Sequence, residues 1–172
     1  MKSFFKRFFS FFSLFIFLSY LGNSQRWSQI GSDIVGKSGT LSGFSISMSG
    51  DGTIVAIGAP ENNDYGPDDY GSVRIYKFEN NTWTQLGADI DDSATGLGGI
   101  VGNVRDRSGS SVSLSNEGTI VAIGAIGHDG YKGTVRIYQY ANNTWTQLGS
   151  DIDGESSGDR NGYSVSLSND GT

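Results

Sequence analysis

The sequence contains no cysteine, so no disulfide can hold the fold together. Stability must therefore come from packing and from the stacking of one part of the chain on another. Basic residues are also few, with 12 Lys and Arg against 18 Asp and Glu. Phosphate binding needs clustered Lys and Arg, so this balance excludes nucleic acid and anionic lipid as expected partners.

Long apolar runs are absent after the first 24 residues. The one early run, Phe8–Leu21, is apolar apart from three serines. The basic residues Lys2, Lys6 and Arg7 precede it, and small residues at Gly22–Ser24 follow, which is the pattern of a secretory signal peptide. A membrane anchor is the alternative, but a span needs about 20 apolar residues and this run is shorter.

We therefore predict that residues 1–24 are a signal peptide and that the mature chain is secreted or displayed at the cell surface. Removal of the leader leaves nine basic residues against 18 acidic ones, a formal charge of −9. We expect no membrane insertion of the mature chain within this fragment, because no second apolar run follows.

A helical period is also absent, and what the sequence has in its place is a repeat. The copies cover about 43–87, 109–149 and 162–172, and Trp27, Trp83 and Trp145 mark the period. The third copy stops at a turn that leads, in both earlier copies, into an apolar run. We expect the chain to be a fragment of a longer protein, cut inside its third repeat.

Each copy contains runs with the period of a β-strand. Ser45–Ser49, Ser111–Ser115 and Ser164–Ser168 alternate apolar residues with serine, as strands do. The next runs, Thr53–Ala59 and Thr119–Ala125, are apolar on both sides, which predicts strands buried on both faces. Tight turns containing Asp-Gly or Glu-Gly join the first run to the second, because glycine supplies the positive φ that tight hairpins need.

A third and a fourth run complete each copy, and paired asparagines form the turn between them. These runs are Val73–Phe78 and Thr82–Leu86 in the first copy, and Val135–Tyr140 and Thr144–Leu148 in the second. Four short strands per unit predict an all-β fold, a β-propeller with four-stranded antiparallel blades. A β-helix or stacked β-solenoid is the alternative. Residues 27–34 match a fourth strand alone, so we expect them to be the outer strand of the closing blade.

The sequence motifs of the repeat resemble FG-GAP repeats, the units of integrin α-chain propellers and their bacterial and algal relatives. The matching segments are Gly43–Ser47, Val55–Pro60 and Gly71–Tyr76. The resemblance covers nearly all of residues 27–172 and implies a partial propeller, 25–172, used in extracellular adhesion. In the second copy, Ser110 stands for Phe44 and Ile126 for Pro60.

Calcium binding is a family property that these residues do not retain. The family's calcium loop lies between the first two strands and is rich in Asp, whereas each loop here has one carboxylate, Asp51 or Glu117. One carboxylate cannot supply the six to eight oxygens that Ca²⁺ takes. We therefore predict no cofactor, and calcium is the alternative that the resemblance leaves open.

The connections fall into two classes. The short first–second and third–fourth turns share one face of the sheet array, and the variable second–third and fourth–first loops share the other. Repeat proteins often bind ligands through their variable loops, so we predict the binding site on that face. A solvated turn region is the alternative explanation for its polar residues. The candidate ligand residues are Asp64, Tyr65, Asp68, Asp69, Tyr70, Arg105, Arg107, His128, Asp129 and Tyr131.

Other polar residues are weaker candidates for cation binding, catalysis or glycosylation. The carboxylates that could hold a cation are Asp89, Asp91, Asp151 and Asp153, but the first copy of this pattern, Asp33-Ile34-Val35, lacks the second carboxylate, and no metal site is predicted. His128 is the only histidine, and a hydrated loop side chain explains it as well as acid–base catalysis does. Asn80 and Asn142 begin glycosylation sequons that also suit a turn. Arg74 and Arg136, in mid-strand, are expected to cover apolar surface with their heads solvated or paired.

These observations predict a secreted or cell-surface binding or adhesion module with an extracellular protein or glycan ligand. No catalytic constellation is visible, so we do not predict an enzyme. The alternatives are a propeller-based enzyme acting on extracellular polysaccharide, with its catalytic residues mostly outside this fragment, and a passive structural array of repeats.

Overall fold

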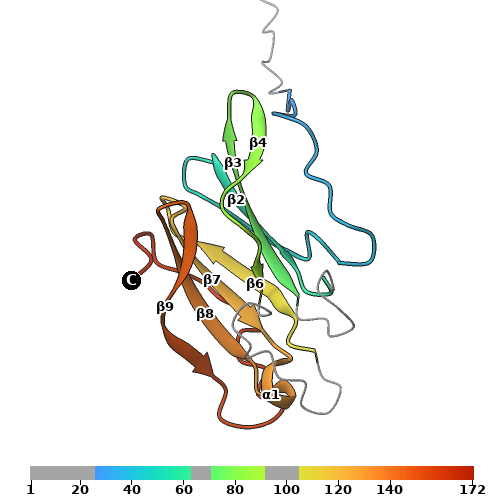
Figure 1. Ribbon diagram of the computed structural model, residues 1–172, viewed down its shortest axis with the longest axis vertical. Helices are drawn as coiled ribbons and strands as arrows, with labels where there is room; N and C mark the ends of the chain where they lie inside the picture. The colour runs from blue at the N-terminus through green and yellow to red at the C-terminus, as the bar shows by residue number, and fades with distance from the viewer. Residues whose placement is uncertain (1–25, 63–70, 92–104) are drawn as a thin grey trace, which may run out of the picture.

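The computed structural model describes residues 26–62, 71–91 and 105–172 (Figure 1). The predicted signal peptide lies outside the described residues, and so do candidate ligand residues Asp64, Tyr65, Asp68, Asp69 and Tyr70. The described chain is all-β, with two antiparallel sheets and one short helical turn. No helix among the described residues has the length and hydropathy to cross a membrane.

Each sheet is built from one copy of the repeat, with its strands in sequence order. In the first sheet the path is β1-β2-β3-β4, and β5 also pairs with β3; in the second it is β6-β7-β8-β9. The elements are β1 (Ser45–Met48), β2 (Ile54–Ala59), β3 (Ser72–Glu79), β4 (Thr82–Gln85), β5 (Ile90–Asp91), β6 (Ser108–Leu114), β7 (Ile120–Ala125), α1 (His128–Tyr131), β8 (Thr134–Ala141) and β9 (Thr144–Asp153). The all-β prediction is confirmed.

The turns form as their residues dictate. Gly52 and Gly118 have φ of 75° and 69° in the first–second turns, where a side chain would strain the backbone. Asn80 and Asn142 have φ of 51° and begin the third–fourth turns. Asparagine tolerates this left-handed region, so both hairpins close without glycine.

The second strand of each repeat lies at the centre of its sheet and is buried on both faces, as predicted. Every residue of β2 is buried except Ile57, and every residue of β7 except Ile120. The fourth strand is longer than predicted. Ile90–Asp91 and the end of β9 continue to pair with the third strand, so the fourth–first loops begin only after Asp91 and Asp153.

Serine hydroxyls join one repeat to the next. Ser45 Oγ donates to Gly109 O at 2.8 Å, and Ser111 Oγ donates to Gly162 O at 2.7 Å. Two residues further along β1, Ser47 Oγ accepts a hydrogen bond from the Leu114 N–H at 2.9 Å. The serine side of each first strand therefore faces the following repeat, and the hydroxyls satisfy backbone groups that an edge strand would otherwise leave open.

The apolar side of each first strand consequently faces the preceding repeat. Val112 and Leu114 of β6 are buried, at 8% and 7% exposure, because the first sheet covers them. Ile46 and Met48, their counterparts in β1, are 61% and 53% exposed. The same strand sequence is thus core in one repeat and surface in the other.

Residues 27–34 lie beside the first sheet as residues 83–90 lie beside the second. Trp83 Nε1 donates to Ile30 O at 3.3 Å, and Trp145 Nε1 donates to Leu86 O at 2.8 Å. Neither 27–34 nor the third copy, 164–168, forms a strand. A fourth strand pairs with the third strand of its own repeat, and a first strand with the second, and no such neighbour lies beside these segments in the described chain.

Candidate functional site

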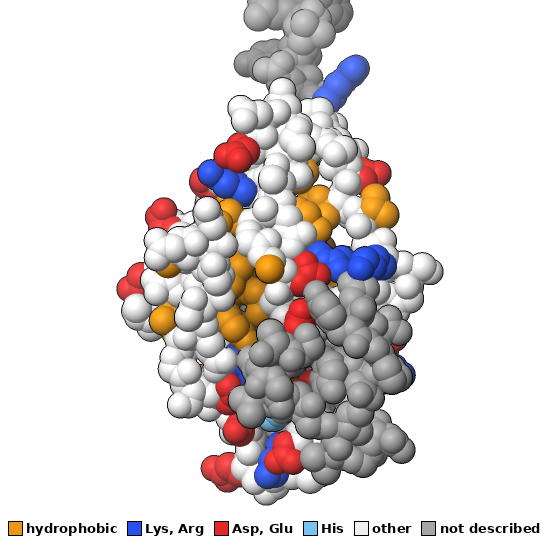
Figure 2. Space-filling model, viewed as in Figure 1, with side chains coloured by type: hydrophobic (Ala, Val, Ile, Leu, Met, Phe, Trp, Pro, Cys, Tyr) orange, Lys and Arg blue, Asp and Glu red, His pale blue; other side chains and the backbone are white. Residues whose placement is uncertain are grey.

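The described parts of the loops that differ between the two repeats, with α1 among them, lie at one end of the sheets (Figure 1). Isolated parallel bridges link Gly71 to Ser108 and Gly133 to Asn161 at this end, so each repeat is tied to the next there. Figure 2 shows apolar side chains in a central band and most acidic side chains around the margin. The candidate site is therefore built from loop residues held by the sheet framework.

A small hollow opens between the two repeats at the base of these loops. Its volume is about 140 Å³, and its lining includes Phe44, Pro60 and Ile126. Arg107 Nη2 lies 3.5 Å from Glu61 Oε1 at its rim. Both partners remain partly exposed, so the ion pair adds little stability and stays accessible to a ligand.

His128 is not the hydrated loop side chain of the simpler explanation. Its Nδ1 lies 2.9 Å from Asp106 Oδ2, and the Asp106 side chain is only 1% exposed. The hydrogen bond that His128 donates to Asp106 raises the pKa of His128, and burial opposes this without cancelling it. Asp129, the sequence neighbour of His128, pairs with Lys132 at 2.7 Å.

Two of the four carboxylates that were considered for cation binding, Asp89 and Asp151, have structural partners. Asp89 accepts from Arg74 Nε at 2.8 Å and from Gln85 at 2.7 Å. Asp151 accepts from Arg136 Nε and from Gln147, both at 2.7 Å. The mid-strand arginines are thus paired, which was one of the two expectations for them.

The Arg and Gln contacts also set the charge state of Asp151. Burial raises the pKa of Asp151, but the hydrogen bonds from Gln147 and Arg136 and the guanidinium charge outweigh it. The pKa of Asp151 therefore lies below its ordinary value, and the carboxylate is ionised at neutral pH. Asp33, the equivalent residue in 27–34, accepts the corresponding glutamine hydrogen bond, from Gln29 at 2.7 Å.

Tyr131 lies close to an arginine that the sequence analysis did not single out. The Arg160 guanidinium lies over the Tyr131 ring, 5.6 Å from its centre, within cation–π range. Arg160 follows Asp159 as Arg107 follows Asp106, each pair leading into the glycine that opens the next repeat. Arg107 and Arg160 both have positive φ, 57° and 54°. The recurrence of Asp-Arg before the glycine is the sequence pattern that could have identified Arg160 as a candidate residue.

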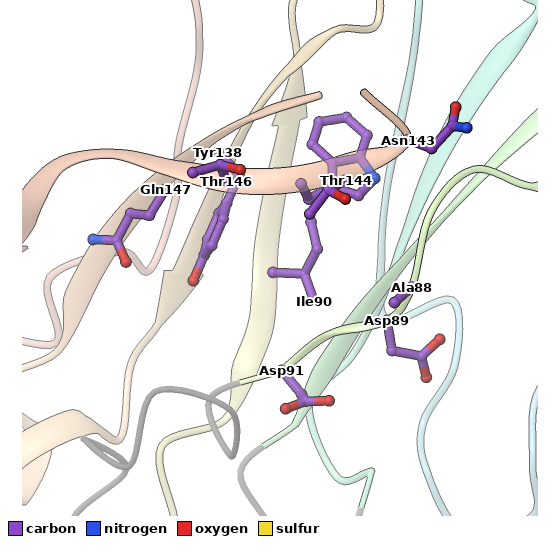
Figure 3. A pocket seen from close by; sticks show the side chains of 10 residues that line it. Ala88, Asp89, Ile90, Asp91, Tyr138, Asn143, Thr144, Thr146 and Gln147 are labelled. Carbon is purple, nitrogen blue, oxygen red and sulfur yellow. The ribbon is translucent and has the colours of Figure 1, made fainter. Parts of the chain in front are cut away.

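A larger groove, about 330 Å³ in volume, separates the end of the first sheet from the outer strands of the second. Ile90 projects into it toward β9, and Asp89 and Asp91 project from the other side of the same segment (Figure 3). Tyr138 and Trp145 form its apolar wall. Trp145 already donates its N–H to Leu86 O, so the wall also holds the repeats together.

The remaining predicted residues lie apart from one another. Asn80 and Asn142 are exposed in their hairpin turns, at the opposite ends of the third strands from the variable loops. Arg105 precedes the buried Asp106 on the loop side. The structure thus brings together His128, Asp151 and Asp153, while Asp89 and Asp91 lie in the first repeat, at the edge of the groove.

No protein-family model matches the chain, and no curated protein matches it. The function is therefore argued from the geometry.

Proposed function

We propose that this chain is part of a secreted β-propeller of the FG-GAP type. Support comes from the repeated serine and tryptophan contacts, which relate the first repeat to the second in the way that 27–34 is related to the first. In a closed ring, 27–34 supplies the outer strand of the closing blade. The exposed Ile46 and Met48 side chains then pack on the serine side of that blade.

The propeller serves as a binding or adhesion module that uses its variable-loop face. The observation that carries this proposal is the Glu61–Arg107 pair at the rim of an apolar hollow between two repeats. An apolar floor with a few fixed polar groups is the usual form of a binding site. The arrangement suits an extracellular protein or glycan that offers both a polar group and an apolar surface.

We expect Arg107→Ala to weaken capture of that ligand by at least roughly tenfold, as loss of a charged partner at an interface does. The measurement is binding of the full chain to glycan and extracellular-matrix protein arrays, followed by titration of any hit. The matched control is Glu117→Ala, which removes an exposed charge from the turn face.

Equal loss of binding in both variants would contradict the loop-face location. Absence of any hit with folded protein would instead favour a passive structural array. Hydrolysis of a polysaccharide on the array would favour the enzymatic alternative.

A further inference from the structure

We propose that His128, Asp151 and Asp153 form a binding site for a divalent transition-metal ion of the zinc type, with Asp106 orienting the histidine. A ring nitrogen of His128 and one carboxylate oxygen from each aspartate lie within 4.8 Å of one another. Two ligands of one tetrahedral zinc ion lie about 3.4 Å apart, given bonds of about 2.0–2.2 Å. The site therefore tightens when an ion binds, chiefly by rotation of Asp153, the exposed member of the three.

The Asp106–His128 hydrogen bond prepares the imidazole for a metal. Nδ1 donates to Asp106 Oδ2, so in the neutral ring Nε2 carries the free lone pair. Metal-binding histidines commonly donate their other N–H to a carboxylate, which fixes the tautomer and raises ligand basicity. Asp106 would thus orient the metal-binding His128 without binding the metal itself.

Asp106 also supplies an observation independent of the three ligands. Its side chain is 1% exposed, and its Oδ1 is buried with no hydrogen-bond partner. A buried carboxylate is costly unless a positive charge compensates it. A neutral His128 brings none, whereas a protonated or metal-bound His128 does.

The charge of the surrounding cluster points to a divalent ion. Four carboxylates face two permanent cations here, leaving a formal charge of −2 when His128 is neutral. The groups are Asp106, Asp129, Asp151 and Asp153, with Lys132 paired to Asp129 and Arg136 paired to Asp151. One divalent cation balances the excess.

The ligand types select the metal. One imidazole nitrogen with two carboxylates suits zinc and related transition metals, whereas Ca²⁺ and Mg²⁺ prefer oxygen alone. Arg136 and Gln147 hold Asp151 in position, each at 2.7 Å, in the way that outer hydrogen bonds orient metal-binding carboxylates. Water completes the coordination from the exposed side of Asp153.

The first repeat provides an internal comparison. Its second–third loop carries Asn62 where the second repeat has His128, and Asn62 Nδ2 donates to Ser72 Oγ at 2.8 Å. Asp89 and Asp91 stand where the second repeat has Asp151 and Asp153. Among the described residues the site is therefore confined to the second repeat, and it does not depend on the proposed adhesive function.

The test is zinc binding by the chelator-treated full chain, measured by calorimetry with Zn²⁺ and by the visible spectrum with Co²⁺. We expect one saturable site. His128→Asn, which copies the first repeat, and Asp153→Asn should each weaken binding by at least roughly tenfold, and Asp106→Asn by about 10- to 100-fold. Asp91→Asn, the matched change in the first repeat, should bind as the wild type does.

Circular dichroism of each ion-free variant establishes that it is folded before it is compared. The absence of saturable zinc binding by folded wild type would overturn the proposal. Equal affinity in wild type and His128→Asn, or a Co²⁺ spectrum with oxygen ligands only, would overturn it as well.

Discussion

His128 shows how the environment of one residue sets its chemistry. Its imidazole meets the Asp106 carboxylate on Nδ1, and Arg136, Asp151, Asp153 and Asp129 are the other charged groups around it. The Asp106 hydrogen bond dominates, so the pKa of His128 in the folded chain lies above that of the unfolded chain. Folding is therefore linked to protonation of this ring.

The sign of this linkage gives a pH prediction for the ion-free protein. The stabilisation is fully present below the unfolded pKa of about 6.5 and is lost as pH rises through the raised folded pKa. We expect the melting temperature of wild type to exceed that of His128→Asn by more at about pH 5.5 than at about pH 8. Thermal melts with a chelator present measure this, and a difference constant across that range would contradict it.

At the scale of the element, the first strand of each repeat faces the next repeat with serine and the previous one with apolar side chains. Serine on such a strand would ordinarily be read as the solvent side. Here Ser45 and Ser111 bond to Gly109 O and Gly162 O of the following repeat. The alternation therefore encodes two interfaces rather than an inside and an outside.

The fourth strand makes the other contact between repeats, through a glycine beneath an indole. A Cβ at Gly87, where φ is +78°, would lie 2.8 Å from Trp145 Cδ1. Gly149 occupies the same position in the second repeat with φ +70°, and a Cβ there meets nothing within 4 Å. Both glycines have a positive φ that would strain an alanine, and only Gly87 has a side chain within 4 Å of the added Cβ.

Alanine substitutions at Gly87 and Gly149 distinguish the free-energy cost of backbone strain from that of a side-chain clash. Gly149→Ala should cost about 1–2 kcal/mol for the left-handed backbone, and Gly87→Ala about 1–3 kcal/mol more for the clash. Urea unfolding of both variants gives the free energies. Equal losses of unfolding free energy in the two variants would show that Trp145 can move aside without destabilising the protein. The indole contact would then not hold the repeats together.

At the scale of the whole molecule, the described array has two unlike ends. One end exposes Ile46 and Met48 on β1, and the other exposes the hydroxyls of Ser164 and Ser166. The contact between the two repeats joins a serine side to an apolar side, so the two ends are complementary. Such surfaces associate head to tail when they are not covered.

We therefore expect residues 25–172 of this chain to self-associate as their concentration rises. Replacing Ile46 and Met48 together by serine should reduce the association without lowering the melting temperature, because both side chains are already more than half exposed. Sedimentation velocity over a concentration series measures this. Association that is unchanged in the double variant would place the contact elsewhere.

The sequence predicted the strands and turns well, because these depend on local pattern. The serine alternation, the runs apolar on both sides and the paired asparagines each specify a backbone conformation within a few residues. The extension of pairing to Asp91 and Asp153 was missed, since aspartates after a glycine resemble the start of a loop. Pairing there is fixed by the third strand, which lies far away in the sequence.

The candidate site was predicted as a face and as a set of candidate residues, without the contacts among them. Sequence alone determined that the variable loops share one end of the sheets, because antiparallel strands alternate direction. Only the tertiary structure decided which side chains meet there. Asp106 lies 22 positions from His128 and Arg136 lies 15 from Asp151, and they are brought together by strand pairing across a repeat. Local pattern fixes where a chain turns, whereas contacts between distant residues depend on how the turned segments pack.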